Sequence, residues 1–88
     1  MKIKIKYFAS IREALGTDQE DVDTHATTVG GLRDELIARG GAHAPALART
    51  RDGKSRAVRA ALDQRMCAED AALREGCEVA FFPPVTGG

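Results

Sequence analysis

The chain has 88 residues, the size of one small domain, because compact domains run from about 50 to 250 residues. Its 13 basic residues equal its 13 acidic residues, so the formal net charge is zero. This balance argues against a general nucleic-acid-binding protein, which carries a strong basic excess. A hydrophobic content of 43% with 30% charged residues is typical of a folded domain and excludes the disordered class.

The segments and motifs that the sequence lacks indicate where the protein is located and whether it binds a metal. No apolar stretch approaches the roughly 20 residues that a membrane helix needs, and the Lys–Ile alternation at the N-terminus is not a secretory signal. Cys67 and Cys77 are too few for a disulfide scaffold. We therefore expect a cytoplasmic protein with free thiols that binds no membrane. His25 and His43 have no partners at zinc-ligand spacing, which predicts no metal site and two surface histidines.

The first part of the chain predicts two strands joined by a short helix. Residues 2–8 alternate with period two, which places Phe8 on the polar face beside the lysines. Residues 9–15 are expected to form a short helix that ends at Gly16. Residues 20–25 are mostly polar and predict a weak strand at a sheet edge.

The main helix is expected to begin after the N-cap residue Thr28 and to run to about Arg39. Its apolar stripe consists of Val29, Leu32 and Leu36. Gly30 and Gly31 each cost up to about 1 kcal/mol relative to alanine in a helix, which predicts a frayed first turn. A further short helical turn is expected over 42–49, interrupted by Pro45.

The second part of the chain predicts strands only. The basic stretch 49–59 is interpreted as a solvated loop. Alternation over 58–63 predicts a third strand, and a short fourth strand follows at 66–67. The last strand covers 78–82 and ends where two prolines follow, since proline cannot donate ladder hydrogen bonds.

This order of elements predicts an α+β fold with the β-grasp, or ubiquitin-like, topology: a mixed sheet with one main helix packed across it. A ferredoxin-like fold is the alternative, although it needs a second full helix between the later strands. We expect one domain over 1–82 and an extended, flexible C-terminal Gly-Gly tail over 83–88. The predicted core consists of Ile3, Ile5, Tyr7, Leu32, Leu36, Leu62, Val79 and Phe81.

The segment 78–88, EVAFFPPVTGG, carries the specific signal. Together with the segment 8–13 after the first strand, it resembles the small, sulfur-carrying subunits of molybdopterin synthases, within the ubiquitin-like sulfur-carrier family. The resemblance covers most of the chain and is loose between about 18 and 56. It implies the β-grasp fold and a reactive Gly88.

The resemblance implies a sequence of reactions at that carboxyl group. A separate adenylating, E1-like enzyme would activate Gly88 with ATP, and a sulfur donor would then convert it to a thiocarboxylate. Docked in the large synthase subunit, the thiocarboxylate would donate sulfur to cyclic pyranopterin monophosphate to make molybdopterin. The implied assembly is a heterotetramer with two large subunits. The chain itself would hold no permanent cofactor, since the partner enzyme consumes the ATP.

The composition of the tail suits this role physically. Pro83 and Pro84 restrict the chain where it leaves the sheet, and from Val85 to Gly88 the extended reach is about 13 Å at roughly 3.3 Å per residue. Glycines without Cβ atoms are able to pass through a narrow channel. The residues expected to thread the partner's active site are Pro83, Pro84, Val85, Thr86 and Gly87.

Phe8 and Phe82 both fall on the outward register of their strands, which lie side by side in a β-grasp sheet. We expect these rings to form an exposed docking patch beside the tail. Met66 is expected to join it, because a flexible thioether suits a surface that meets two partners.

Other functions use the same features. The carrier could serve thiamine, cysteine or tRNA thiolation pathways, or the activated glycine could modify lysines of other proteins. A non-covalent ubiquitin-like interaction module would tolerate loss of Gly87 and Gly88, and a terminal Gly-Gly can also be a frayed end. An independent enzyme is the least expected class, since the sequence shows no nucleophile–base pair or metal cluster.

Overall fold

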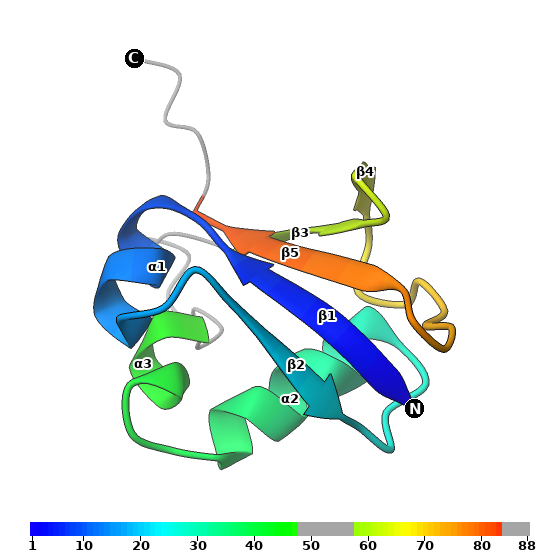
Figure 1. The fold of residues 1–88 in the computed structure, drawn as a ribbon, viewed down its shortest axis with the longest axis horizontal. Coiled ribbons are helices and arrows are strands. Elements are labelled where there is room, and N and C mark those ends of the chain that lie inside the picture. Colours follow the sequence, from blue (N-terminus) through cyan, green and yellow to red (C-terminus); the bar gives the residue numbers. More distant parts are fainter. Residues whose placement is uncertain (48–57, 84–88) are drawn as a thin grey trace.

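The computed structural model describes residues 1–47 and 58–83, and its centre is a five-stranded sheet in the order β2-β1-β5-β3-β4 (Figure 1). Strand β1 pairs in parallel with β5, whereas the other neighbours are antiparallel, so the sheet is mixed. The strands are β1 (Lys2–Tyr7), β2 (Gln19–Asp23), β3 (Arg59–Leu62), β4 (Arg65–Cys67) and β5 (Glu78–Phe82).

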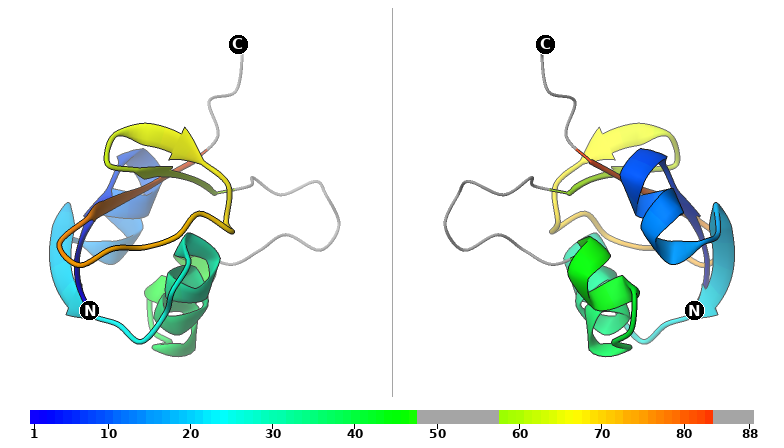
Figure 2. Two further views of the ribbon diagram at one scale, coloured as in Figure 1. Left: turned by 90° about the vertical axis from the view of Figure 1, so that its right-hand side faces the viewer. Right: turned by 90° about the vertical axis from the view of Figure 1, so that its left-hand side faces the viewer.

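Three helices accompany the sheet: α1 (Ala9–Leu15), α2 (Val29–Ala38) and α3 (His43–Leu47). Helices α2 and α3 lie together on one side of the sheet (Figure 2). This arrangement confirms the predicted β-grasp topology. The ferredoxin-like alternative is wrong, because residues 58–83, which carry β3, β4 and β5, contain no helix. Across the described ranges, each helix falls short of the length and apolar character needed to cross a membrane.

The core lies between the sheet and α2. The inward residues of β1 and β5 are almost fully buried, and they pack against the predicted stripe of α2. Tyr7 stacks on Phe81 with ring centroids 6.4 Å apart and planes at 18°. Leu62 is only half-buried and packs at the margin of this core. The main core residues are Ile3, Ile5, Tyr7, Val29, Leu32, Leu36, Val79 and Phe81.

The start of α2 is well bonded, so the prediction of a frayed first turn is wrong. The Thr28 hydroxyl accepts the Gly31 N–H at 3.1 Å as an N-cap. The Gly30 N–H donates to the Glu69 carbonyl at 2.7 Å. A Cβ at Gly30 would lie 3.0 Å from the Cβ of Glu69, so glycine is what lets the helix approach this loop closely.

Two further predictions concern the middle of the chain. Helix α3 passes through Pro45 without interruption, because a proline in the first helical turn loses only an N–H that has no partner within the helix. The predicted strand 58–63 forms as β3, which begins at Arg59. Most of the basic stretch 49–59 lies outside the described residues.

Candidate docking site beside the C-terminal tail

The end of β5 is fastened to the turn between β1 and α1. Tyr7 pairs with Phe81 in the parallel register, and the Phe8 N–H donates to the Phe81 carbonyl at 3.1 Å. Strand β1 ends at Tyr7, and Phe8 is the N-cap residue of α1. The prediction that Phe8 belongs to the first strand is therefore wrong. The cause is a turn at Ala9, whose φ of 51° takes the chain out of the strand direction. The Phe8 side chain is 44% exposed.

An apolar strip crosses the outer face of the sheet, on the side away from α2. We define the apolar strip as Phe8, Ala61, Met66, Ala80 and Phe82. Register places Ala80, Ala61 and Met66 in one row across β5, β3 and β4, and Met66 is 59% exposed. Phe82 is half-buried at the end of β5. Ala61 and Ala80 in the middle of the strip are buried, so its exposed apolar groups are Phe8, Met66 and part of Phe82.

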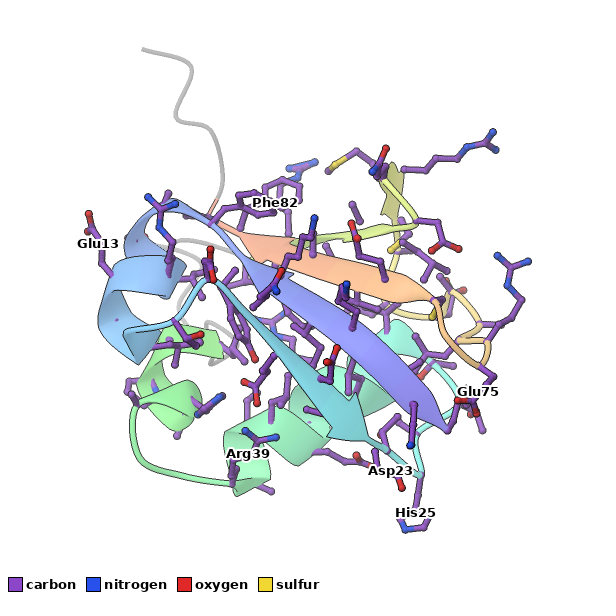
Figure 3. The ribbon with its side chains drawn as sticks, viewed as in Figure 1. Glu13, Asp23, His25, Arg39, Glu75 and Phe82 are labelled. Atoms are coloured by element: carbon purple, nitrogen blue, oxygen red, sulfur yellow. The ribbon has the colours of Figure 1, made fainter. Side chains whose placement is uncertain are left out.

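Figure 3 shows Phe82 at the end of β5 that lies near α1, whereas Asp23 and Glu75 lie at the opposite end of the sheet. Pro83 follows Phe82 and is half-buried. The remaining predicted tail residues, Pro84, Val85, Thr86, Gly87 and Gly88, lie outside the described residues. The division into a domain over 1–82 and a tail over 83–88 therefore stays a prediction.

A polar cluster fixes Tyr7 from the side of the helices. The Tyr7 hydroxyl donates to Glu20 Oε2 at 2.6 Å, and Arg39 donates to Glu20 Oε1 at 2.9 Å. His43 Nε2 lies 2.9 Å from Glu20 Oε2, and its ring meets Tyr7 edge-on at 6.2 Å. His43 is half-buried in this cluster, so the prediction that it is a surface residue is wrong. His25 is exposed as predicted.

The cluster shifts the acidity of two of its members. Burial raises the pKa of Tyr7 far above its ordinary value, and the hydrogen bond to Glu20 and the charge of Glu20 raise it further. Burial alone would raise the pKa of Glu20, but hydrogen bonds from Arg39, Tyr7 and His43 outweigh it and lower that pKa to about 2. At neutral pH the cluster therefore holds a carboxylate and a neutral phenol.

The lowered pKa predicts an acid-sensitive contribution to stability. The Glu20 pKa falls from 4.5 to about 2 on folding, so its stabilisation is complete above the unfolded value and is lost as pH falls toward the folded value. We expect Glu20→Gln to lower the free energy of unfolding at pH 7 by about 1–2 kcal/mol, after allowing for solvent screening of half-exposed groups. Urea unfolding at a series of pH values measures this.

The control for that experiment is Asp21→Asn, because Asp21 is an exposed neighbour on the same strand. The difference between wild type and Glu20→Gln should shrink between about pH 5 and pH 2. A constant difference across this range would contradict the assigned role of the carboxylate.

Neither thiol lies in a setting that activates it. Cys77 is buried and Cys67 is half-buried, and both are free. Burial, together with the charge of Asp70, raises the pKa of Cys67, which lowers its thiolate fraction at neutral pH. Within residues 1–47 and 58–83, no group of three or more His, Cys, Asp or Glu side chains is placed to hold a metal ion.

The described residues therefore place an apolar strip beside the start of the tail. The sequence predicted Phe8, Met66 and Phe82 as members of this patch, but not the two alanines between them or the cations that flank them. Arg59 lies directly across from Phe82, and Lys6 directly across from Ala80. The alternating lysines of the first strand were the available signal for Lys6. The place of Arg59 depends on the pairing of β3 with β5, which no local pattern reveals.

Comparison with known proteins shows which family has this sequence and fold. The ThiS family model matches residues 5–88. The molybdopterin synthase sulfur carrier subunit of Escherichia coli is 44% identical over 86 residues, covering 98% of this chain and 99% of that protein. The crystal structure of SAMP1 from Haloferax volcanii is 32% identical with a TM-score of 0.77, covering all of both chains.

A putative molybdopterin converting factor, subunit 1, from Pyrococcus furiosus is 27% identical with a TM-score of 0.73 and covers 97% of this chain and 99% of that one. The similarity in sequence and in fold thus extends over the whole chain, including the segment that carries the tail. The chain belongs to the ThiS family.

Proposed function

We propose that the chain is the sulfur carrier of a molybdopterin synthase and that Gly88 carries the sulfur. The observation that supports this most strongly is the whole-length similarity to the sulfur carrier subunit of E. coli. The apolar strip beside the start of the tail agrees with it, because a carrier must present its terminus while a partner holds its folded body.

The proposed chemistry balances in two steps. The Gly88 carboxylate attacks the α-phosphate of ATP, which forms an acyl adenylate and releases pyrophosphate. Hydrosulfide supplied by the donor then attacks the acyl carbon and displaces AMP, which leaves a thiocarboxylate and a proton. Adenylation is needed because a carboxylate oxygen is a very poor leaving group. The described residues supply no base for either step, so we assign those groups to the partner enzymes.

The partners in this proposal are an E1-like adenylating enzyme and the large synthase subunit. Within the large subunit, the thiocarboxylate would transfer sulfur to cyclic pyranopterin monophosphate, in an assembly of two small and two large subunits. Pro83, Pro84, Val85, Thr86 and Gly87 would thread the partner's active site, while Phe8, Met66 and Phe82 dock against its surface. The proposal assigns the reaction to the cytoplasm, which supplies ATP, and gives the chain no cofactor of its own.

The test is the intact mass of the chain after incubation with ATP, a sulfur source and the adenylating enzyme. We expect a gain equal to the replacement of one oxygen by sulfur, located at Gly88. A variant without Gly88 is the control and should show no gain. If the wild-type chain gains no mass while the enzyme adenylates another substrate, the sulfur-carrier proposal is wrong.

A second candidate function is protein modification, favoured by the similarity to SAMP1, for which a closely related structure is described as a small archaeal modifier protein. In that case a lysine amine would displace AMP from Gly88 and form an isopeptide bond. Conjugates that survive strong reductant and disappear when Gly88 is deleted would identify this function. A thioester or a thiocarboxylate would not give such conjugates.

A further inference from the structure

We propose that the free edge of β2 binds an extended segment of another protein in which basic and apolar residues alternate. Strand β2 is the outermost strand of the sheet, at the opposite end of the strand order from β4. Both views in Figure 2 show β2 (cyan) at the margin of the ribbon. The inference involves neither the tail nor the apolar strip, so it goes beyond the proposed function.

The pairing with β1 decides which backbone groups of β2 face the free edge. Just before β2 begins, the Tyr7 N–H donates to the Asp18 carbonyl at 2.9 Å. Hydrogen-bonded and non-hydrogen-bonded pairs alternate along an antiparallel ladder. Every second residue of β2 therefore turns its N–H and C=O away from β1. Counted from the Asp18 pair, these outward-facing residues are Gln19, Asp21 and Asp23.

Most of these outward backbone groups have no partner. The Gln19 carbonyl accepts the Thr17 hydroxyl at 2.9 Å. Within residues 1–47 and 58–83, the three outward N–H groups and the carbonyls of Asp21 and Asp23 make no hydrogen bond. All three outward-facing residues are exposed. Such a row of unpaired groups is a template for a further strand, and its main-chain hydrogen bonds supply the affinity when an extended segment is added to a sheet.

The charges of β2 select the segment that is able to pair there. The strand and the residue before it carry four carboxylates and no cation: Asp18, Glu20, Asp21 and Asp23. Arg39 pairs with Glu20 and the N-terminal ammonium with Asp23, whereas Asp21 forms no ion pair within the described ranges. Opposite charges directly across a ladder are favourable and like charges are not. A basic residue is therefore favoured across from Asp21, and a second copy paired through β2 is disfavoured because it would bring the carboxylates together.

The pairing of β2 with β1 already shows the pattern that fits. Lys4 lies across from Asp21, and Ile3 lies across from Val22, so basic residues meet the outer face of β2 and apolar residues its inner face. Side chains of a strand project above and below the sheet, so a strand on the free side meets the same two faces. Val22 is half-buried against the core, and an apolar residue beside it would bury it further. The expected complement therefore repeats the alternation of residues 2–6, KIKIK.

The experiment titrates the full-length chain with the peptide acetyl-KIKIK-amide at about 0.1 M salt and follows the backbone amide signals by NMR. We expect saturable shifts at Gln19, Asp21 and Asp23, with a dissociation constant of about 1 mM for so short a segment. The same peptide with a methyl group on every backbone nitrogen keeps its side chains and should not bind. The acidic peptide acetyl-EIEIE-amide should not bind either.

Two variants of one residue distinguish the charge from the backbone. Asp21→Asn keeps the outward N–H and should weaken peptide binding by about 2- to 5-fold. Asp21→Pro also removes that N–H, which β1 does not use, and should weaken binding by more than about 10-fold. The methylated peptide tests the same point on the wild-type chain, whether or not the proline variant folds.

Three results would overturn the inference. They are the absence of saturable binding, equal binding of the methylated or the acidic peptide, and shifts of the same amide signals with protein concentration alone, which would assign the edge to a second copy. A chain without Gly87 and Gly88 should bind the peptide as the wild type does. Failure of the inference would therefore leave the proposed sulfur-carrier function intact.

Discussion

Replacement of Phe82 by alanine is expected to weaken binding to the large synthase subunit by about 30- to 100-fold, or about 2–3 kcal/mol. Phe82 lies at the end of β5, directly before the first proline of the tail, and alternation along the strand places it on the same face as Ala80. Aromatic residues at the centre of a contact contribute most of the binding energy of typical interfaces. Isothermal titration calorimetry with the purified large subunit measures the loss.

Two controls distinguish the contribution of the Phe82 ring to affinity from an effect on the fold and from the contribution of the tail. Phe82→Leu retains an apolar side chain and should lose much less affinity. Deletion of Gly87 and Gly88, alone and combined with Phe82→Ala, forms a double-mutant cycle that divides the strip's contribution from that of the tail. Unchanged affinity of a folded Phe82→Ala chain would show that the partner holds the tail alone and does not contact the strip.

Replacement of Arg33 by alanine is expected to lower the free energy of unfolding by about 2–3 kcal/mol. Arg33 on α2 is only 4% exposed. Its Nε donates to the Leu47 carbonyl at 2.7 Å, and its Nη1 donates to Glu69 Oε2 at 2.8 Å. Its removal would leave a buried carbonyl and a carboxylate without these donors. Small domains are stable by only about 5–15 kcal/mol, so this loss is a large part of the total.

Arg39→Ala is the matched control, because Arg39 also pairs with a carboxylate but is 44% exposed. Exposed pairs contribute about 0–1 kcal/mol, and we expect a loss of that order. Urea unfolding of both variants at pH 7 compares them. Similar small losses for the two arginines would mean that burial adds little to the contribution of Arg33.

Local sequence patterns were sufficient to predict most helices and strands and the apolar stripe of α2. The N-cap at Thr28 and the stripe Val29, Leu32, Leu36 describe α2 correctly, since both are short-range properties of a helix. Alternation in the first strand predicted which of its residues are buried, whereas in the last strand Ala80 is buried as well as the predicted Val79 and Phe81. The resemblance of the C-terminal segment to sulfur carriers then identified the family, which periodicity alone does not do.

Contacts between distant segments were not predictable in this way. His43 meets Glu20 across 23 positions, and Arg33 meets Glu69 across 36. A pattern that assigns charged residues to solvent misplaces both. Gly30 was interpreted as a weakness of α2, because the Glu69 atoms that would meet a Cβ at this position lie in a loop that follows β4. Each of these errors arises where a residue contacts a distant part of the chain that only the tertiary fold brings near.

The parallel pairing of β1 with β5 has a consequence for synthesis of the chain. Tyr7 pairs with Phe81, so β1 needs a partner strand that is made much later, and contacts this far apart in sequence slow folding. While the chain is still on the ribosome, β1 and β3 lack the strand that lies between them. A chain that stops before β5 is therefore expected to lack the folded sheet, and partners that recognise the sheet would not engage it.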